Sequence, residues 1–171
     1  MKKLFIIRHA KSSWSEDKDD FDRKLKKRGM TDAGFMAEKL LSRGAKIQQI
    51  VSSSSRRTTD TTQIMNDYIG LRKSKISFTK ELYLASPKSV ISQIKSMDDS
   101  VNELMIVAHN PSVTQVVNHL ANEHFDNIPT LGIACILFDD KSWSTIKNNG
   151  KLGFYIYPKM FKQKKNNENI Q

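Results

Sequence analysis

Arginine and histidine side chains follow directly on three short apolar stretches of this sequence. The first stretch, Leu4–Ile7, runs into Arg8 and His9. Guanidinium groups pair with phosphate oxygens, and an imidazole can act as nucleophile, base or metal ligand. Because arginines would repel a metal ion and no carboxylate accompanies them, the set favours a phosphate dianion over a divalent cation, and we predict no metal ligands. The other two stretches lead to Ser52–Ser55, Arg56, Arg57, His109 and Asn110.

The apolar stretches themselves predict the elements that hold these side chains. Leu4–Ile7, Ile47–Val51 and Leu104–Ala108 are short and continuously apolar, as buried strands are. Strands that alternate with helices indicate an α/β domain with a largely parallel sheet, whose strands share one carboxyl edge. Apolar residues at helical spacing predict helices that begin at Thr31 (as N-cap), Arg57, Pro87 and Pro111, the first ending before Gly44.

Loops and minor strands complete the expected layout. Residues 12–28 are rich in charge and lack an apolar period, so we expect a long surface loop there. Ile76–Phe78 is expected as a short strand. Ala134–Phe138 and Ser142–Ile146 are expected to pair as a hairpin through Asp139–Lys141.

The composition indicates one domain with an anionic partner. A chain of 171 residues without repeats or linkers suits a single domain, expected over residues 1–158, followed by a basic tail over residues 159–171 that we expect to be disordered. The formal net charge of +10 favours phosphate esters, phosphorylated protein or nucleic acid as partners. Cys135 is the single cysteine, and no apolar run is long enough to cross a membrane, so we expect a soluble, cytoplasmic protein.

Four stretches together resemble one protein family in order and spacing. They are Leu4–Trp14, Asp22–Gly29, Val51–Thr61 and Val107–Pro111. These stretches are similar to the motifs of the histidine phosphatase (phosphoglycerate-mutase-like) superfamily, and more narrowly of its short bacterial members, the phosphohistidine phosphatases. Lys24 stands where the family usually has proline, and Ala108 where it has glycine. The resemblance implies a three-layer α/β sandwich in which helices flank a mostly parallel central sheet.

The same resemblance assigns roles to the residues at the strand ends. It implies that His9 is the nucleophile and becomes a phosphohistidine during the reaction, without a metal or other cofactor. Arg8, Arg57 and His109 would hold the phosphoryl oxygens. Ser12 follows the nucleophile closely enough to contact phosphate as well. Such an assembly suits phosphoryl transfer, which depends mainly on positioning and on electrostatic stabilisation of the transferring group.

The sequence leaves the general acid open. Many relatives supply a carboxylate after the second helix to protonate an alkoxide leaving group. Glu81 is the only acid in the corresponding stretch, Thr79–Leu84, and it is either that acid or a surface carboxylate. Loss of the acid would matter less for phosphohistidine, because its imidazole departs more easily than an alkoxide. A missing acid would therefore favour a phosphoramidate substrate.

We therefore expect a metal-independent phosphatase acting on phosphohistidine in a protein. One alternative is a broad phosphomonoesterase of small phosphorylated metabolites. A second, of another class, is a non-catalytic module that binds phosphate or phosphoprotein, suggested by the net charge of +10. The sequence contains no single-strand-binding, helix-turn-helix or zinc-knuckle signature, so no nucleic-acid partner is expected. No membrane partner is expected, and without a long exposed apolar stripe we expect a monomer.

Overall fold

A six-stranded sheet forms the middle of the described chain. The computed structural model describes residues 1–14 and 17–162, and within them the strands lie in the order β3-β2-β4-β1-β5-β6. β3, β2, β4 and β1 pair in parallel, whereas β5 is antiparallel to both of its neighbours. The expected mostly parallel sheet is confirmed. The strands are β1 (Lys2–Arg8), β2 (Gln49–Ser53), β3 (Ile76–Thr79), β4 (Glu103–Ala108), β5 (Ile133–Phe138) and β6 (Lys151–Ile156).

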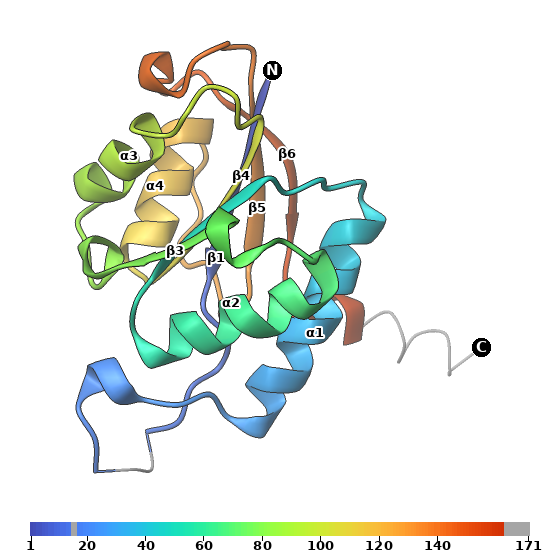
Figure 1. Cartoon of the computed structure of the whole chain (residues 1–171), viewed down its shortest axis with the longest axis vertical. Helices are drawn as coiled ribbons and strands as arrows, with labels where there is room; N and C mark the ends of the chain where they lie inside the picture. The colour runs from blue at the N-terminus through green and yellow to red at the C-terminus, as the bar shows by residue number, and fades with distance from the viewer. Residues whose placement is uncertain (15–16, 163–171) are drawn as a thin grey trace.

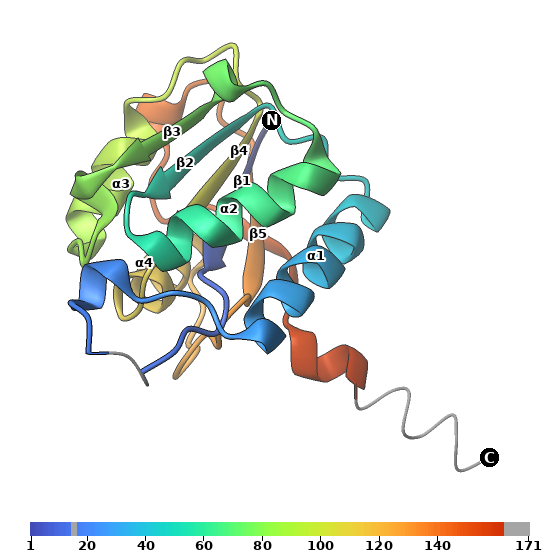
Figure 2. The ribbon, with the colours of Figure 1, turned by 60° about the horizontal axis from the view of Figure 1, so that its bottom comes forward.

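Helices cover both faces of this sheet, which confirms the three-layer α/β sandwich. Figures 1 and 2 show α1 and α2 side by side on one face, with α3 and α4 on the other. Short 3-10 turns connect the main elements. The helices are α1 (Lys27–Ser42), α2 (Arg56–Ile69), α3 (Pro87–Lys95) and α4 (Ser112–Ala121), and the turns are η1 (Asp20–Asp22), η2 (Lys73–Lys75), η3 (Lys80–Leu82) and η4 (Trp143–Thr145).

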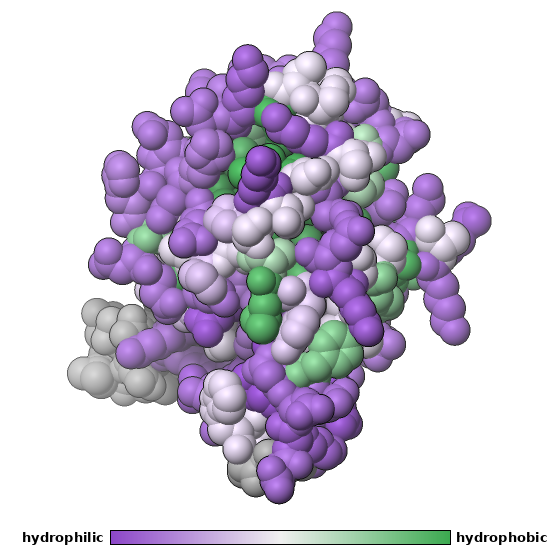
Figure 3. All heavy atoms as spheres, turned by 90° about the vertical axis from the view of Figure 1, so that its left-hand side faces the viewer, coloured by the Kyte–Doolittle hydropathy of each residue, from purple (hydrophilic) through white to green (hydrophobic). Residues whose placement is uncertain are grey.

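Two apolar cores lie on opposite faces of the sheet, because successive side chains of a strand point to opposite sides. In β1, Leu4 and Ile6 pack with residues of α3 and α4, whereas Phe5 and Ile7 pack with residues of α1 and α2. All six residues of β4 are buried, as expected for a parallel strand covered on both faces. The surface is mainly hydrophilic, with small apolar patches, as one face shows in Figure 3.

The predicted start of the first helix is wrong by about one turn. Thr31 is not its N-cap, because α1 already begins at Lys27. The Thr31 hydroxyl instead donates to the Lys27 carbonyl within the helix, at 3.2 Å. Gly29, in the first turn, packs so closely on the Lys11 backbone that an added Cβ would lie 2.3 Å from the Lys11 carbonyl oxygen. The helix therefore starts against the segment that follows β1.

The predicted strand over Ser142–Ile146 is also wrong. These residues form the turn η4, and the antiparallel partner of β5 is β6, further along the chain. Trp143 and Ile146 are both fully buried, and their spacing of three residues places them on one side of a 3-10 turn. The indole nitrogen of Trp143 donates to the Val101 carbonyl at 2.7 Å, which fixes this turn against the loop before β4.

The first residues of the expected disordered tail are ordered. Residues 158–162 are helical, and the ring of Phe161 lies edge-on to that of Phe35 in α1, with centroids 5.6 Å apart. The rest of the expected tail, residues 163–171, lies outside the described residues. Within residues 1–14 and 17–162, no helix has the length and apolar character needed to cross a membrane.

Candidate active site

The polar residues that end β1, β2 and β4 meet at the carboxyl edge of the sheet. β4 lies between β1 and β2, and Arg8 at the end of β1 is paired with Ala108 at the end of β4. The ring centroids of His9 and His109 are consequently only 5.4 Å apart. Figure 1 shows the segment between β1 and α1 running below this edge. The convergence predicted from the sequence is therefore present.

His9 is oriented so that its Nε2 atom carries the free lone pair. The Nδ1 atom lies 2.7 Å from the Ala10 carbonyl oxygen, which can only accept, so Nδ1 is the protonated nitrogen. The Ala10 amide in turn donates to the Thr61 hydroxyl of α2 at 3.0 Å. Burial lowers the pKa of His9 to about 3, and the charges of Arg57 and Arg8 add to this against the opposing Ala10 hydrogen bond. The imidazole is therefore neutral at ordinary pH.

His109 faces the same space from β4. Its Nε2 atom lies 2.8 Å from the Ser53 hydroxyl of β2, while its buried Nδ1 atom has no partner among the described residues. Burial, followed by the charge of Arg57, lowers the pKa of His109 to about 3. A Ser53 hydroxyl that donates to Nε2 leaves the proton of the neutral ring on Nδ1, where an acceptor oxygen of a bound group could accept it.

Arg8 and Arg57 each hold an N–H group that no described residue accepts. Arg8 Nη1 donates to the Ile128 carbonyl at 3.0 Å, and Arg57 donates to Asp20 through both terminal nitrogens. The Nε atoms of both arginines are buried without a partner, as is Nδ1 of His109. Buried polar groups in proteins are nearly always hydrogen-bonded. A bound group with several acceptor oxygens, such as a phosphoryl group, would satisfy all three.

The site also contains three residues to which the sequence gave no role, namely Asp20, Arg23 and Tyr83. The Asp20 carboxylate accepts from Arg23 through Oδ1 at 3.0 Å, and from Arg57 and the Tyr83 hydroxyl through Oδ2 at 3.0 and 2.5 Å. Burial would raise the pKa of the Asp20 carboxyl, but these hydrogen bonds hold it well below its usual range. Arg23 lies in a stretch that resembles the family motif, which was the one available signal. Asp20 and Tyr83 gave none.

Glu81 and Ser12 occupy different positions relative to this site. The exposed carboxylate of Glu81 accepts from the Gln93 amide of α3, and from none of the site residues. Ser12 is buried, and its hydroxyl accepts from Arg23 Nη2 at 2.6 Å. Ser12 is thus connected to the site through Arg23, whereas Glu81 lies outside its hydrogen bonds.

Other features of the described chain do not provide a competing site. Within residues 1–14 and 17–162, no group of three or more His, Cys, Asp or Glu side chains is placed to hold a metal ion. A surface groove of about 930 Å³ lies between α2 and β3, lined by residues that include Asp60, Ile64 and Phe78. No histidine or arginine lines this groove, so it offers neither a nucleophile nor a guanidinium fork for phosphate.

The matched family agrees with this geometry. Residues 4–83, which include most of β1 and all of α2, match the model of the histidine phosphatase superfamily, branch 1. Over these residues the chain is similar to that superfamily, and the match supports a phosphatase. The matched segment contains Arg8, His9 and Arg57, whereas His109 lies beyond it.

The proteins that this chain resembles are distant in sequence, and the solved structures among them are close in fold. An uncharacterized protein of Mycobacterium leprae is 29% identical over 143 residues, which cover 76% of this chain and 86% of the relative. SixA from Agrobacterium tumefaciens superposes with a TM-score of 0.79 at 24% identity, covering 92% of this chain and 98% of SixA. The protein histidine phosphatase SixA in complex with tungstate gives 0.80 at 21% identity, over 93% and 99% of the chains.

Proposed function

We propose that this phosphatase removes the phosphoryl group from phosphohistidine in a protein, through a phosphohistidine intermediate on His9. Two observations support the proposal. An unprotonated His9 Nε2 lies in a site with three buried guanidinium or ring nitrogens that have no partners, and the carboxylate that the site does contain is held ionised. The similar SixA structures are described as histidine phosphatases, which agrees with such a substrate.

In the first step, His9 Nε2 attacks phosphorus in line with the bond to the leaving group. The new bond joins Nε2 to phosphorus, and the electron pair of the bond between phosphorus and the leaving nitrogen goes to that nitrogen. The substrate imidazole leaves neutral because its other ring nitrogen carries a proton. Arg8 Nε, Arg57 Nε and His109 Nδ1 would donate to the equatorial phosphoryl oxygens as their charge changes. Water then attacks the phosphorus of phospho-His9, which releases inorganic phosphate and restores the neutral imidazole.

The proposed leaving group, an imidazole, follows from the lack of a proton donor among the acidic side chains near the site. Asp20 has a pKa well below its usual range, so it carries no proton at neutral pH. Tyr83 already donates its proton to Asp20, and Glu81 is engaged with Gln93 on the outside. An alkoxide leaving group needs a proton donor that these residues do not supply. The imidazole of phosphohistidine can take a proton from water on its other ring nitrogen and then leave as a neutral ring, whose conjugate acid has a pKa of about 6.5, without a proton donor from the enzyme.

A series of leaving groups tests the proposal. We expect phosphate release in EDTA from a phosphohistidine-bearing protein and from p-nitrophenyl phosphate, whose leaving group is also weakly basic. Glycerol phosphate, with an alkoxide leaving group, should react at least about 10²-fold more slowly, which is the low end of what a general acid contributes. The His9→Ala variant should release nothing from any of the three.

The opposite order of substrates would contradict the proposal. Rapid hydrolysis of glycerol phosphate with little release from phosphohistidine would make the protein a phosphomonoesterase of small metabolites. In that case Glu81→Gln should slow glycerol phosphate hydrolysis, because only a proton donor would explain the reaction of an alkyl ester.

A further inference from the structure

Asp20 is bound by three side chains of the site, although it lies on η1, away from the strands that carry the nucleophile. Its carboxylate and carbonyl groups accept hydrogen bonds from Arg57, Arg23 and Tyr83. We infer that Asp20 is a positioning residue for phosphoryl transfer, which aligns these three side chains around the phosphoryl group. The inference concerns the alignment of the site and rests on the phosphatase activity, whichever phosphorylated substrate is the natural one.

Asp20 fixes Arg57 from its far end. Arg57 Nη1 donates to the Asp20 carbonyl at 2.6 Å, and Nη2 donates to the carboxylate at 3.0 Å. Only 3% of Arg57 is exposed, so its guanidinium has no solvent with which to exchange these bonds. Both terminal nitrogens are thus held by one residue, while Nε on the side of the guanidinium remains without a partner. Asp20 therefore orients the Arg57 guanidinium and leaves its Nε–H group free to donate to a bound phosphoryl group.

Arg23 connects Asp20 to the segment that follows the nucleophile. It donates to the Asp20 carboxylate at 3.0 Å, to the Ser12 hydroxyl at 2.6 Å and to the Ser13 carbonyl at 3.1 Å. The guanidinium also lies 3.2 Å above the ring of Trp14. These contacts fasten η1 to the chain just after His9. A shift of Asp20 would therefore be transmitted to both guanidiniums.

Tyr83 connects Asp20 to the second histidine. Its hydroxyl donates to the carboxylate at 2.5 Å, and its ring lies edge-on to that of His109, with centroids 5.5 Å apart. The Tyr83 ring also lies edge-on to that of Phe21, with centroids 4.9 Å apart. Asp20 therefore determines where Tyr83 rests, and Tyr83 forms one wall of the space beside His109.

The negative charge of Asp20 makes it possible to distinguish two effects of this residue, the alignment of the site and the electrostatic attraction of an anion. Arg8, Arg23 and Arg57 contribute three positive charges, and ionised Asp20 leaves a net of two, which matches a phosphoryl dianion. Removing the carboxylate makes the site more positive, so Coulomb attraction alone would strengthen the binding of an anion. Loss of alignment instead lowers kcat, because misplaced donors stabilise the transition state less. The two effects have opposite signs.

The test measures kcat on p-nitrophenyl phosphate and the Kd for tungstate, a tetrahedral dianion, in the full-length protein. For Asp20→Asn we expect kcat to fall about 10²-fold, the size of a misplacement of about 1 Å, while tungstate binds no more weakly than to wild type. Asp22→Asn is the matched control. It removes the same charge from the same turn, at an exposed carboxylate that forms no ion pair with a described residue, and should leave both values unchanged.

Tyr83→Phe keeps the inference testable if Asp20→Asn does not fold. It removes one hydrogen bond without removing the charge, and we expect kcat to fall about tenfold with an unchanged Kd for tungstate. An unchanged kcat in the variant that folds would overturn the inference. So would a parallel loss of kcat and tungstate binding, which indicates a collapsed pocket. A wild type that hydrolyses p-nitrophenyl phosphate but not phosphohistidine would refute the proposed substrate and leave this test intact.

Discussion

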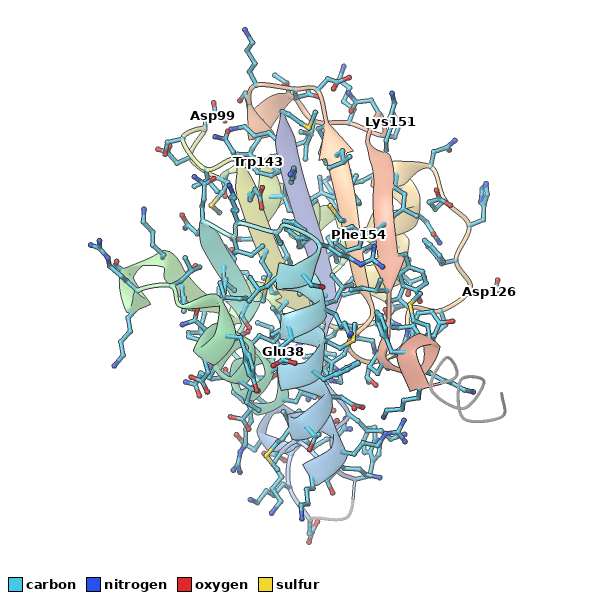
Figure 4. All side chains as sticks on the ribbon, turned by 90° about the vertical axis from the view of Figure 1, so that its right-hand side faces the viewer. Glu38, Asp99, Asp126, Trp143, Lys151 and Phe154 are labelled. Atoms are coloured by element: carbon cyan, nitrogen blue, oxygen red, sulfur yellow. The ribbon has the colours of Figure 1, made fainter. Side chains whose placement is uncertain are left out.

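β1 begins with a buried cation and ends with a half-buried one, and the two cations differ in how many of their N–H groups are accepted. At the amino end, Lys2 is 1% exposed, and its ammonium donates to the Asp99 carbonyl, the Val101 carbonyl and Asn102 Oδ1 at 2.5, 2.9 and 3.1 Å. Figure 4 shows Asp99 and Trp143 at this end of the sheet. At the carboxyl end, Arg8 has one acceptor, the Ile128 carbonyl, and its Nε is buried without a partner.

The difference separates a structural cation from a functional one. An ammonium whose three donors are all accepted stabilises the fold, and nothing remains for a ligand. A guanidinium left partly unpaired is costly to the folded state, and such a cost is expected where binding or catalysis uses the free group. Substitutions at the amino end should therefore reduce stability, and substitutions at the carboxyl end should reduce activity.

The largest effect is expected from His9→Ala at the carboxyl end. Removal of the nucleophile should lower phosphate release by at least about 10³-fold, because no other described group beside the site can form the intermediate. The melting temperature should remain close to that of wild type, since the ring's hydrogen bond to the described residues is a local one, to the Ala10 carbonyl. Activity within about tenfold of wild type would mean that another residue is the nucleophile.

Arg57→Ala should have the next largest effect on activity. Loss of a preorganised donor typically costs about 10² to 10³ in kcat. Arg56→Ala is the matched control, because Arg56 lies next to Arg57 in α2 but is exposed and pairs only with Asp60, at 3.7 Å. It should leave kcat/KM within about threefold. Equal losses in both variants would show that the net positive charge, rather than the fork of Arg57, carries the effect.

At the amino end, Lys2→Met should lower stability and leave activity unchanged, the opposite of the substitutions at the carboxyl end. It leaves the Asp99 carbonyl and Asn102 Oδ1 without this donor, while the Val101 carbonyl keeps the Trp143 indole. The free energy of unfolding should therefore fall by roughly 2–3 kcal/mol, measured by urea denaturation. The rate of phosphate release per folded molecule should not change. Lys3→Met is the control, because Lys3 is partly exposed and forms a 3.3 Å ion pair with Glu103. Loss of activity in folded Lys2→Met would contradict the separation of the two ends.

The smallest expected effect per residue is on the pH dependence of stability. His9 and His109 have pKa values lowered to about 3, mainly by burial. The unfolded chain, with histidine pKa values near 6.5, binds more protons between about pH 6.5 and 3, so stability falls as the pH falls through this window. At pH 5 this amounts to roughly 2 kcal/mol for each histidine.

Thermal denaturation at pH 7.5 and pH 5 checks this dependence. The loss of Tm on acidification should be smaller in His109→Asn than in wild type. Because His9 is already neutral, kcat/KM should show no inflection near pH 6.5 from the enzyme. An inflection there that disappears in His109→Asn would mean that His109 titrates at its ordinary pKa.

The sequence was sufficient to predict the strands that carry the site. Their apolar runs are continuous because β1 and β4 are covered on both faces, and Arg8, His9 and His109 stand directly after them. Asp20 could not be predicted, because it is one of four aspartates within residues 17–22, and only the fold brings it to Arg57. The η4 turn was missed because burial of Trp143 depends on contacts across the chain.

Trapping of the phosphorylated enzyme tests the central claim most directly. The protein is mixed with a phosphohistidine-bearing protein, quenched with base within the first turnover and digested for mass spectrometry, since phosphohistidine is labile in acid. The account predicts one phosphoryl group on His9, absent in His9→Ala and absent from acid-treated samples. Phosphate release without any label on His9, or a label that persists in His9→Ala, would contradict it.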